Sequence, residues 1–139
     1  ACNLRCPGCY SDSDDKTNKL EWSLVDRIIE EAKALWGERF FVISGGEPFA
    51  YRSEGKGLLE LFEKHQDSFF MVFTNGTLID DTIAERLSTS GNALLCLSVE
   101  GFRERTDARR GAGARARRPR VLQSHCPAWQ RSRSYAECD

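Results

Sequence analysis

The chain has 139 residues, of which 40% are hydrophobic. This size and composition suit one folded domain and exclude a chain that is disordered over its whole length. Its 20 lysine and arginine residues nearly balance its 21 aspartate and glutamate residues, so the net charge of −1 gives no case for a nucleic-acid-binding or membrane-surface protein. No apolar run approaches the ~20 residues that span a bilayer, and no secretory leader opens the chain. We therefore expect a cytoplasmic location.

The first feature in chain order is a cysteine cluster. Cys2, Cys6 and Cys9 stand in a C-x3-C-x2-C spacing. Thiolates are soft ligands that suit zinc or iron–sulfur clusters. Structural zinc needs four ligands in a closed site, and neither His65 nor His125 is an obvious fourth. Electron-carrying four-iron clusters are normally closed by four cysteines, so three thiolates would leave one iron open to a substrate or cofactor.

Beyond this loop the sequence alternates between helical and strand patterns. Apolar residues at three-to-four-residue spacing predict an amphipathic helix over residues 23–36, ended by Gly37. Three runs that are apolar almost throughout predict strands buried on both faces. These runs are residues 40–43, 69–73 and 93–97. Two shorter helices are predicted between them, around residues 58–62 and after a cap at Asp80 or Asp81.

This order of elements predicts an α/β fold of about three βα units, with parallel strands joined by helical crossovers. Each strand ends in a polar or glycine-rich segment, and in such folds the carboxyl ends of the strands face one rim that carries the chemistry. The segments are Gly45-Gly46-Glu47-Pro48, Thr74-Asn75-Gly76 and Ser98-Val99-Glu100-Gly101. Turn-forming composition explains any one of them alone, but three beside a cysteine cluster predict a shared site.

Together these motifs resemble the radical S-adenosylmethionine (SAM) superfamily. Cys2, Cys6 and Cys9 match its three-cysteine cluster motif, and residues 45–48 match its GGEP motif. Residues 74–76 match the polar end of the following strand, and residues 98–101 resemble its S-x-[DE]-G element. The resemblance covers about residues 1–111. It implies an incomplete parallel (β/α) partial barrel. Tyr10 directly follows the third cysteine, which resembles the Cys-Tyr variants of the family's peptide- or cofactor-maturing (SPASM-like) enzymes.

The resemblance also implies a chemistry. The three cysteines would hold a [4Fe–4S] cluster whose open iron binds SAM, and reductive cleavage of SAM would release a 5′-deoxyadenosyl radical. That radical would abstract hydrogen from a peptide or small-molecule substrate such as a cofactor precursor. The electron would come from a donor such as a flavodoxin or ferredoxin. No membrane or nucleic-acid partner is expected, and no catalytic side chain is implied beyond the cluster and SAM.

Cofactor contacts follow residue by residue from the same resemblance. Gly45, Gly46 and Glu47 would bind the methionine amino group of SAM, through the carboxylate or through backbone groups if Glu47 bonds its own loop. Ser98 and Glu100 would reach the ribose hydroxyls. The remaining implied contacts are Pro48, Thr74, Asn75 and Arg110, the last of which would meet the SAM carboxylate.

The sequence departs from the family in two respects, one residue of the cysteine motif and the number of strands. Gly8 stands where the family usually carries an aromatic residue or histidine that often packs near the adenine. The family core is usually a six-stranded partial barrel, whereas three strands are predicted here. The first strand, which should precede Cys2, and the later strands are missing.

The C-terminal residues have a different composition. Residues 102–139 contain ten arginines, no lysine and four acidic residues, and residues 103–139 contain only Val121 and Leu122 among leucine, isoleucine, valine and phenylalanine. Such a segment cannot build a core. We therefore predict a partial core over residues 1–111 and an irregular Arg-rich tail over residues 112–139, from a frameshifted or truncated gene. A nucleic-acid-binding arm is the alternative for this tail.

Two other functions stay open on the sequence alone. In one, the three cysteines recruit a fourth ligand, and the chain is a non-catalytic zinc- or cluster-binding module. In the other, the chain is an inactive truncated product, because three strands leave an open edge and an uncovered core. Metal content separates the first of these from an enzyme, and protection of strand amides from hydrogen exchange tests the second.

Overall fold

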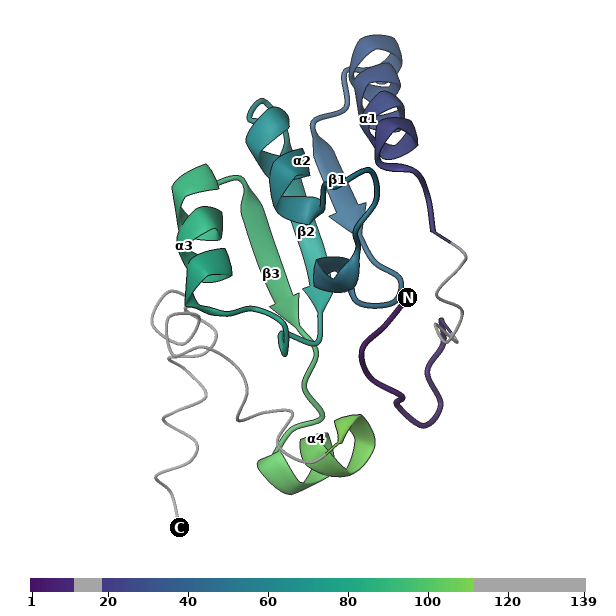
Figure 1. The fold of residues 1–139 in the computed structure, drawn as a ribbon, viewed down its shortest axis with the longest axis vertical. Coiled ribbons are helices and arrows are strands. Elements are labelled where there is room, and N and C mark those ends of the chain that lie inside the picture. Colours follow the sequence, from purple (N-terminus) through teal and green to yellow (C-terminus); the bar gives the residue numbers. More distant parts are fainter. Residues whose placement is uncertain (12–18, 112–139) are drawn as a thin grey trace.

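The computed structural model describes residues 1–11 and 19–111 as a parallel sheet with helices (Figure 1). The predicted tail over residues 112–139 lies outside the described residues. The elements in chain order are α1 (Trp22–Trp36), β1 (Phe40–Ile43), the 3-10 helix η1 (Pro48–Ala50), α2 (Leu58–Lys64), β2 (Phe69–Thr74), α3 (Asp81–Ser90), β3 (Ala93–Leu97) and α4 (Arg103–Arg110). No helix among the described residues is long and apolar enough to cross a membrane.

The sheet has the strand order β1-β2-β3, and both neighbouring pairs are parallel. Phe41 is in register with Phe70, and Val72 of the same central strand is in register with Leu95. Helices α2 and α3 connect the successive strands, as parallel pairing requires. The predicted α/β fold of three βα units is therefore confirmed.

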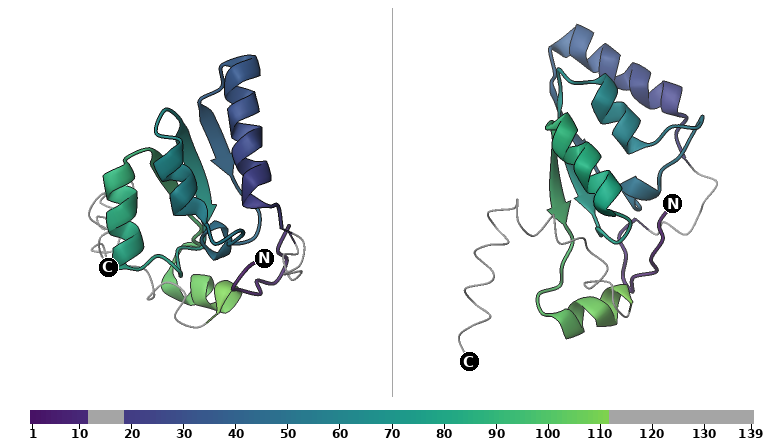
Figure 2. Two further views of the ribbon diagram at one scale, coloured as in Figure 1. Left: turned by 45° about the horizontal axis from the view of Figure 1, so that its top comes forward. Right: turned by 60° about the vertical axis from the view of Figure 1, so that its left-hand side comes forward.

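Helices α1, α2 and α3 cover one face of this sheet (Figure 2). The core lies between the two layers, where Phe62 of α2 and Phe70 and Val72 of β2 are fully buried. The ring centroids of Phe62 and Phe70 are 4.9 Å apart. At the start of α3, the Asp80 carboxylate accepts a hydrogen bond from the backbone N–H of Ile83, which confirms the expected cap.

The opposite face of the sheet is open, contrary to the expectation that both faces are covered. Side chains alternate along a strand, so every second strand residue points away from the helices. Those with 41–56% of their surface exposed are Phe40, Val42, Phe69, Phe73 and Leu94. The apolar sequence is that of a barrel strand, whose second face lines the barrel interior, and three strands do not close a barrel.

Helix α4 was not predicted, because its sequence has no apolar stripe. Its one fully buried described side chain is Thr106, whose Oγ1 accepts a hydrogen bond from the backbone N–H of Glu100 at 3.2 Å. The helix lies beyond the carboxyl end of the sheet, on the same side as the N-terminal loop (Figure 1). It therefore closes part of the rim where the predicted site lies.

Candidate active site

The carboxyl ends of all three strands meet the cysteine loop at one cavity of about 380 Å³. Parallel strands bring their polar ends to the same edge of the sheet, while the N-terminal loop and α4 supply the other walls. The lining residues that come from the predicted set are Cys2, Cys6, Cys9, Gly45, Gly46, Thr74, Asn75, Ser98 and Arg110. The structure thus brings nine of the twelve predicted site residues together.

The three cysteines lie close enough to influence one another electrostatically. The backbone N–H of Cys9 donates to the carbonyl of Cys6 at 3.2 Å, which closes the loop into a turn. Partial burial raises the pKa of the Cys6 thiol, and the neighbouring Cys2 and Cys9 thiols raise it further, while the Arg110 guanidinium opposes the shift. The spacing in sequence therefore becomes a cluster of thiols in space.

Hydrogen bonds fix the cysteine loop to the sheet. The Asn75 side-chain amide donates to Asn3 Oδ1 at 2.9 Å, and Asn3 Nδ2 donates to Thr77 Oγ1 at 2.9 Å. The backbone N–H of Glu47 donates to the carbonyl of Ala1 at 2.9 Å. The loop is thus held at both the first and the second strand ends.

Glu47 is buried in the wall behind the cavity, with 2% of its surface exposed. One carboxylate oxygen accepts from Thr74 Oγ1 at 2.6 Å and from the backbone N–H of Phe49 at 3.1 Å. The other accepts from the backbone N–H of Asn75 at 2.8 Å. Both oxygens are therefore engaged in joining the loop after β1 to the end of β2. Backbone groups of Gly45 and Gly46 remain at the cavity.

Glu100 forms ion pairs with two arginines of α4. Its carboxylate oxygens lie 2.6 Å from Arg110 Nη2 and 3.2 Å from Arg109 Nη1. The hydrogen bond from Arg110 lowers the pKa of the Glu100 carboxyl, so this group is charged at neutral pH. Both guanidinium groups line the cavity, and the Arg110 Nε is buried without a hydrogen-bond partner among the described residues.

Three predicted contacts do not line the cavity, namely Glu47, Pro48 and Glu100. Pro48 is buried at the first position of η1. Sequence reasoning in turn missed several lining residues: Leu4, Tyr10, Ser11, Ser44, Phe73 and Arg109. All six lie within two residues of a predicted site residue, so sequence adjacency was the available signal.

The donor set tests which metal group fits the cavity. Among the described residues, no histidine and no fourth cysteine lines it. A closed zinc site needs a fourth protein ligand, whereas a four-iron cluster on three thiolates keeps an iron available for a further ligand. The cavity walls also offer polar groups and two arginines for such a ligand. The residues present therefore fit a [4Fe–4S] cluster with SAM.

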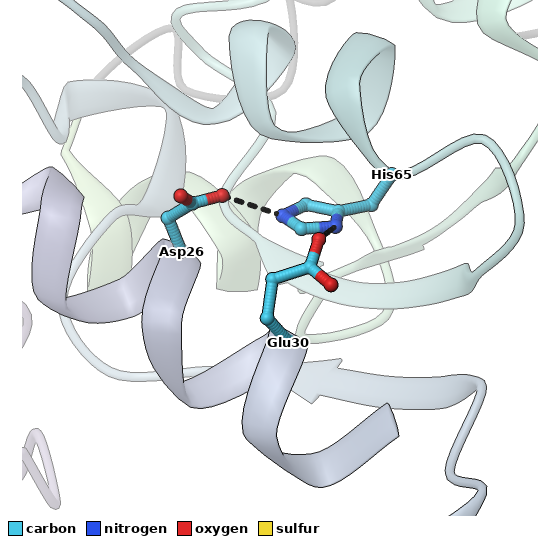
Figure 3. A group of neighbouring side chains, drawn as sticks. All are labelled: Asp26, Glu30 and His65. Carbon is cyan, nitrogen blue, oxygen red and sulfur yellow. Dashed lines mark hydrogen bonds and ion pairs between the residues drawn. The ribbon is translucent and has the colours of Figure 1, made fainter. Parts of the chain in front are cut away.

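A second group of potential ligands lies between α1 and α2, where His65 is fully buried (Figure 3). Its Nε2 lies 2.9 Å from Asp26, while its Nδ1 lies 3.3 Å from Glu30. Lys33 Nζ is 3.2 Å from the same Nδ1, and Lys64 Nζ is 2.6 Å from the Asp26 carboxylate. The acids approach opposite ring nitrogens and already have lysine partners. This group is an ion-pair network joining two helices rather than a metal site.

Comparisons with known proteins agree with the cavity's composition. A family model described as the radical SAM superfamily matches residues 1–123. An Fe-coproporphyrin III synthase of Methanosarcina barkeri is 35% identical over 118 residues, covering 79% of this chain and 27% of that protein. An AdoMet-dependent heme synthase of the same organism is 29% identical over 109 residues, covering 76% of this chain and 30% of that protein.

Solved structures show the same fold. A structure described as native anSMEcpe with bound AdoMet and Kp18Cys peptide superposes with a TM-score of 0.69 at 25% sequence identity. The match covers 88% of this chain and 36% of that one. The chain thus spans about a third or less of the length of the proteins to which it is similar.

Proposed function

This chain belongs to the radical SAM superfamily, and from that membership we propose that it is the cluster- and SAM-binding part of a radical SAM enzyme. Enzymes of this family use a [4Fe–4S] cluster and SAM. The observation that carries the proposal is the single cavity that Cys2, Cys6 and Cys9 share with the ends of all three strands. When bound, the cluster and SAM supply the 5′-deoxyadenosyl radical that abstracts hydrogen from a substrate.

The protein's own residues hold and orient these groups. Cys2, Cys6 and Cys9 are the proposed cluster ligands. Gly45 and Gly46 offer backbone groups to the methionine amino group, because the Glu47 carboxylate is engaged with Thr74 and the backbone of Asn75. Glu47 therefore acts by fixing the loop that carries the two glycines.

Arginine and hydroxyl groups complete the proposed SAM site. Arg110 lines the cavity, its Nε has no hydrogen-bond partner among the described residues, and a guanidinium suits the SAM carboxylate. Ser98 offers a hydroxyl to the ribose, and Thr74 and Asn75 line the same rim. A ribose contact by Glu100 remains a prediction, and it requires this carboxylate to turn from its arginine partners.

The substrate class is proposed from the relatives. Both curated relatives are named as porphyrin or heme synthases, which favours a cofactor precursor. The solved neighbour contains a peptide, so a peptide is the second candidate. The first is preferred because 35% sequence identity to a cofactor synthase exceeds 25% identity to the peptide-bound structure. The electron donor is proposed to be a flavodoxin or ferredoxin.

Formation of 5′-deoxyadenosine tests the proposed function. The chain is reconstituted anaerobically with iron and sulfide, reduced with dithionite and supplied with SAM. We expect 5′-deoxyadenosine from the wild type and none from Cys6→Ala, which removes a proposed ligand. Cys96→Ala is the matched control, since Cys96 lies in β3 and does not line the cavity. Stoichiometric zinc without iron would support the non-catalytic module instead.

A further inference from the structure

We propose that the Ser11 hydroxyl donates a hydrogen bond to the Cys9 thiolate and thereby raises the reduction potential of the cluster that the three cysteines would hold. This inference rests on the proposed function and adds to it a residue that acts on the cluster through one of its ligands. Ser11 lines the cavity and is not itself a proposed ligand of iron or of SAM. Its Oγ lies 3.3 Å from Cys9 Sγ.

The state of Cys9 as a ligand decides the direction of this hydrogen bond. The distance alone fits either atom as the donor. A cysteine that binds a metal does so as a thiolate, which has lost its proton and can only accept. The serine hydroxyl keeps its proton, so Ser11 is the donor whenever Cys9 binds iron. The contact is then a charge-assisted hydrogen bond, which is stronger than one between two neutral groups.

Donor groups also approach the sulfur of a second cysteine. The backbone N–H of Leu4 donates to Cys2 Sγ at 3.4 Å, and the side-chain amide of Asn75 lies 4.0 Å from the same sulfur. The Leu4 donor belongs to the backbone, and Asn75 also binds Asn3 and so holds the cysteine loop on the sheet. Ser11 is therefore the donor that a side-chain substitution can remove while these contacts of the loop stay in place.

A hydrogen bond to a ligating sulfur changes the free energy of electron transfer. Reduction of a [4Fe–4S]²⁺ cluster to the 1+ state adds one electron without making or breaking a bond, and part of the added charge resides on the thiolate sulfurs. A hydroxyl that donates to such a sulfur stabilises the reduced state more than the oxidised state, so the reduction potential rises. Cys9 is exposed, so the relevant quantity is what the serine hydroxyl contributes beyond water that takes its place.

Midpoint potentials from an EPR-monitored titration with dithionite, without SAM, test the inference on the anaerobically reconstituted 139-residue chain. Iron and sulfide per chain are measured for every variant. We expect Ser11→Ala to lower the equilibrium constant for one-electron reduction about three- to tenfold, which shifts the potential downward by roughly 28–59 mV. Ser11→Thr keeps the hydroxyl and should stay within about twofold of the wild type.

Ser44→Ala is the matched control for loss of a hydroxyl at the cavity. Ser44 also lines the cavity, but its hydroxyl lies 2.7 Å from the Tyr10 hydroxyl and is not bonded to a thiolate. Its equilibrium constant for reduction should stay within about twofold of the wild type. Ser11→Val and Ser11→Thr form a second pair, since they have nearly the same shape and differ in the hydroxyl. Of these two, only Ser11→Val should have the lower potential.

Four results would overturn the inference. The first is an unchanged potential in Ser11→Ala and Ser11→Val, and the second is an equal shift in Ser11→Thr and Ser11→Val. The third is a shift in Ser44→Ala as large as that in Ser11→Ala. The fourth is failure of both hydroxyl-free variants of Ser11 to retain a cluster, which would assign this residue to holding the loop. Wild-type protein that shows no four-iron signal would instead overturn the proposed function itself.

Discussion

Glu47 is a motif residue whose carboxylate accepts hydrogen bonds from the polypeptide itself. The resemblance of residues 45–48 to the family's GGEP motif implies a cofactor contact for Glu47, and the residue type does not distinguish a ligand-binding carboxylate from one that organises its own loop. The structure places both of its oxygens on groups of the polypeptide. Motif residues can therefore be found from the sequence. Which of them contacts a ligand and which of them holds the loop in place depends on contacts between segments that are distant in the sequence.

Replacing Glu47 tests this structural role. We expect Glu47→Ala to lower the free energy of unfolding by about 1–3 kcal/mol, because buried donors on Thr74 and Asn75 lose their acceptor. Urea denaturation monitored by circular dichroism measures the change. Glu63→Ala is the matched control, since Glu63 forms an ion pair with Arg86 at the surface and should cost less than about 1 kcal/mol. Equal losses in both variants would contradict the role assigned to Glu47.

Helices and strands could be predicted from the sequence where apolar residues recur with a regular period, and could not be predicted where that period is absent. The three strands, α1 and the cap of α3 follow from apolar spacing and cap chemistry, and the observed bounds of the strands and of α1 differ from the predicted ones by at most one residue. Helix α4 could not be predicted this way, because it is held by the buried Thr106 and by ion pairs to Glu100 rather than by an apolar stripe. Arg109 was missed for the same reason.

The contact between α1 and α2 makes stability depend on pH. Burial and the Lys33 ammonium lower the pKa of His65, whereas Asp26 and Glu30 raise it, and the net shift is downward from 6.5. The unfolded chain therefore binds more protons than the folded chain between the two pKa values. Stability should rise with pH across this window and fall on acidification below about pH 6.5. The other charged groups of this network are Lys64, Asp67 and Arg39.

Urea midpoints at pH 7.5 and 5.5 measure this dependence. Asp26 and Asp67 have lowered pKa values, so their contributions are lost only at more acidic pH. We expect a lower midpoint at pH 5.5 in the wild type and a smaller difference in His65→Gln, which has no imidazole to titrate. Wild-type stability that is unchanged or higher at pH 5.5 would contradict the role assigned to His65.

The open sheet face distinguishes this chain from a closed barrel. The sequence could not predict which face of each strand is exposed. A strand with apolar residues on both faces has the same sequence pattern whether or not its second face is covered. Phe40, Val42 and Leu94 lie on this face and are about half exposed. Contiguous apolar surface of this kind binds apolar dyes and promotes association.

A charge on the open face tests this description. The 139-residue chain by itself is expected to bind the dye ANS in its folded state, and Val42→Lys should reduce the fluorescence while leaving the circular dichroism unchanged. Ala34→Lys is the control, because Ala34 is exposed on α1, away from this face. Equal fluorescence in both variants would show that the dye binds elsewhere.

We propose that Cys2, Cys6 and Cys9 hold a four-iron cluster whose open iron accepts SAM in the cavity at the strand ends. The most direct measurement is EPR spectroscopy of the anaerobically reconstituted, reduced chain, recorded with and without SAM. We predict a [4Fe–4S]⁺ signal that changes when SAM is added and that is lost in Cys6→Ala. A four-iron signal that SAM leaves unchanged, or zinc bound in place of the cluster, would contradict the claim.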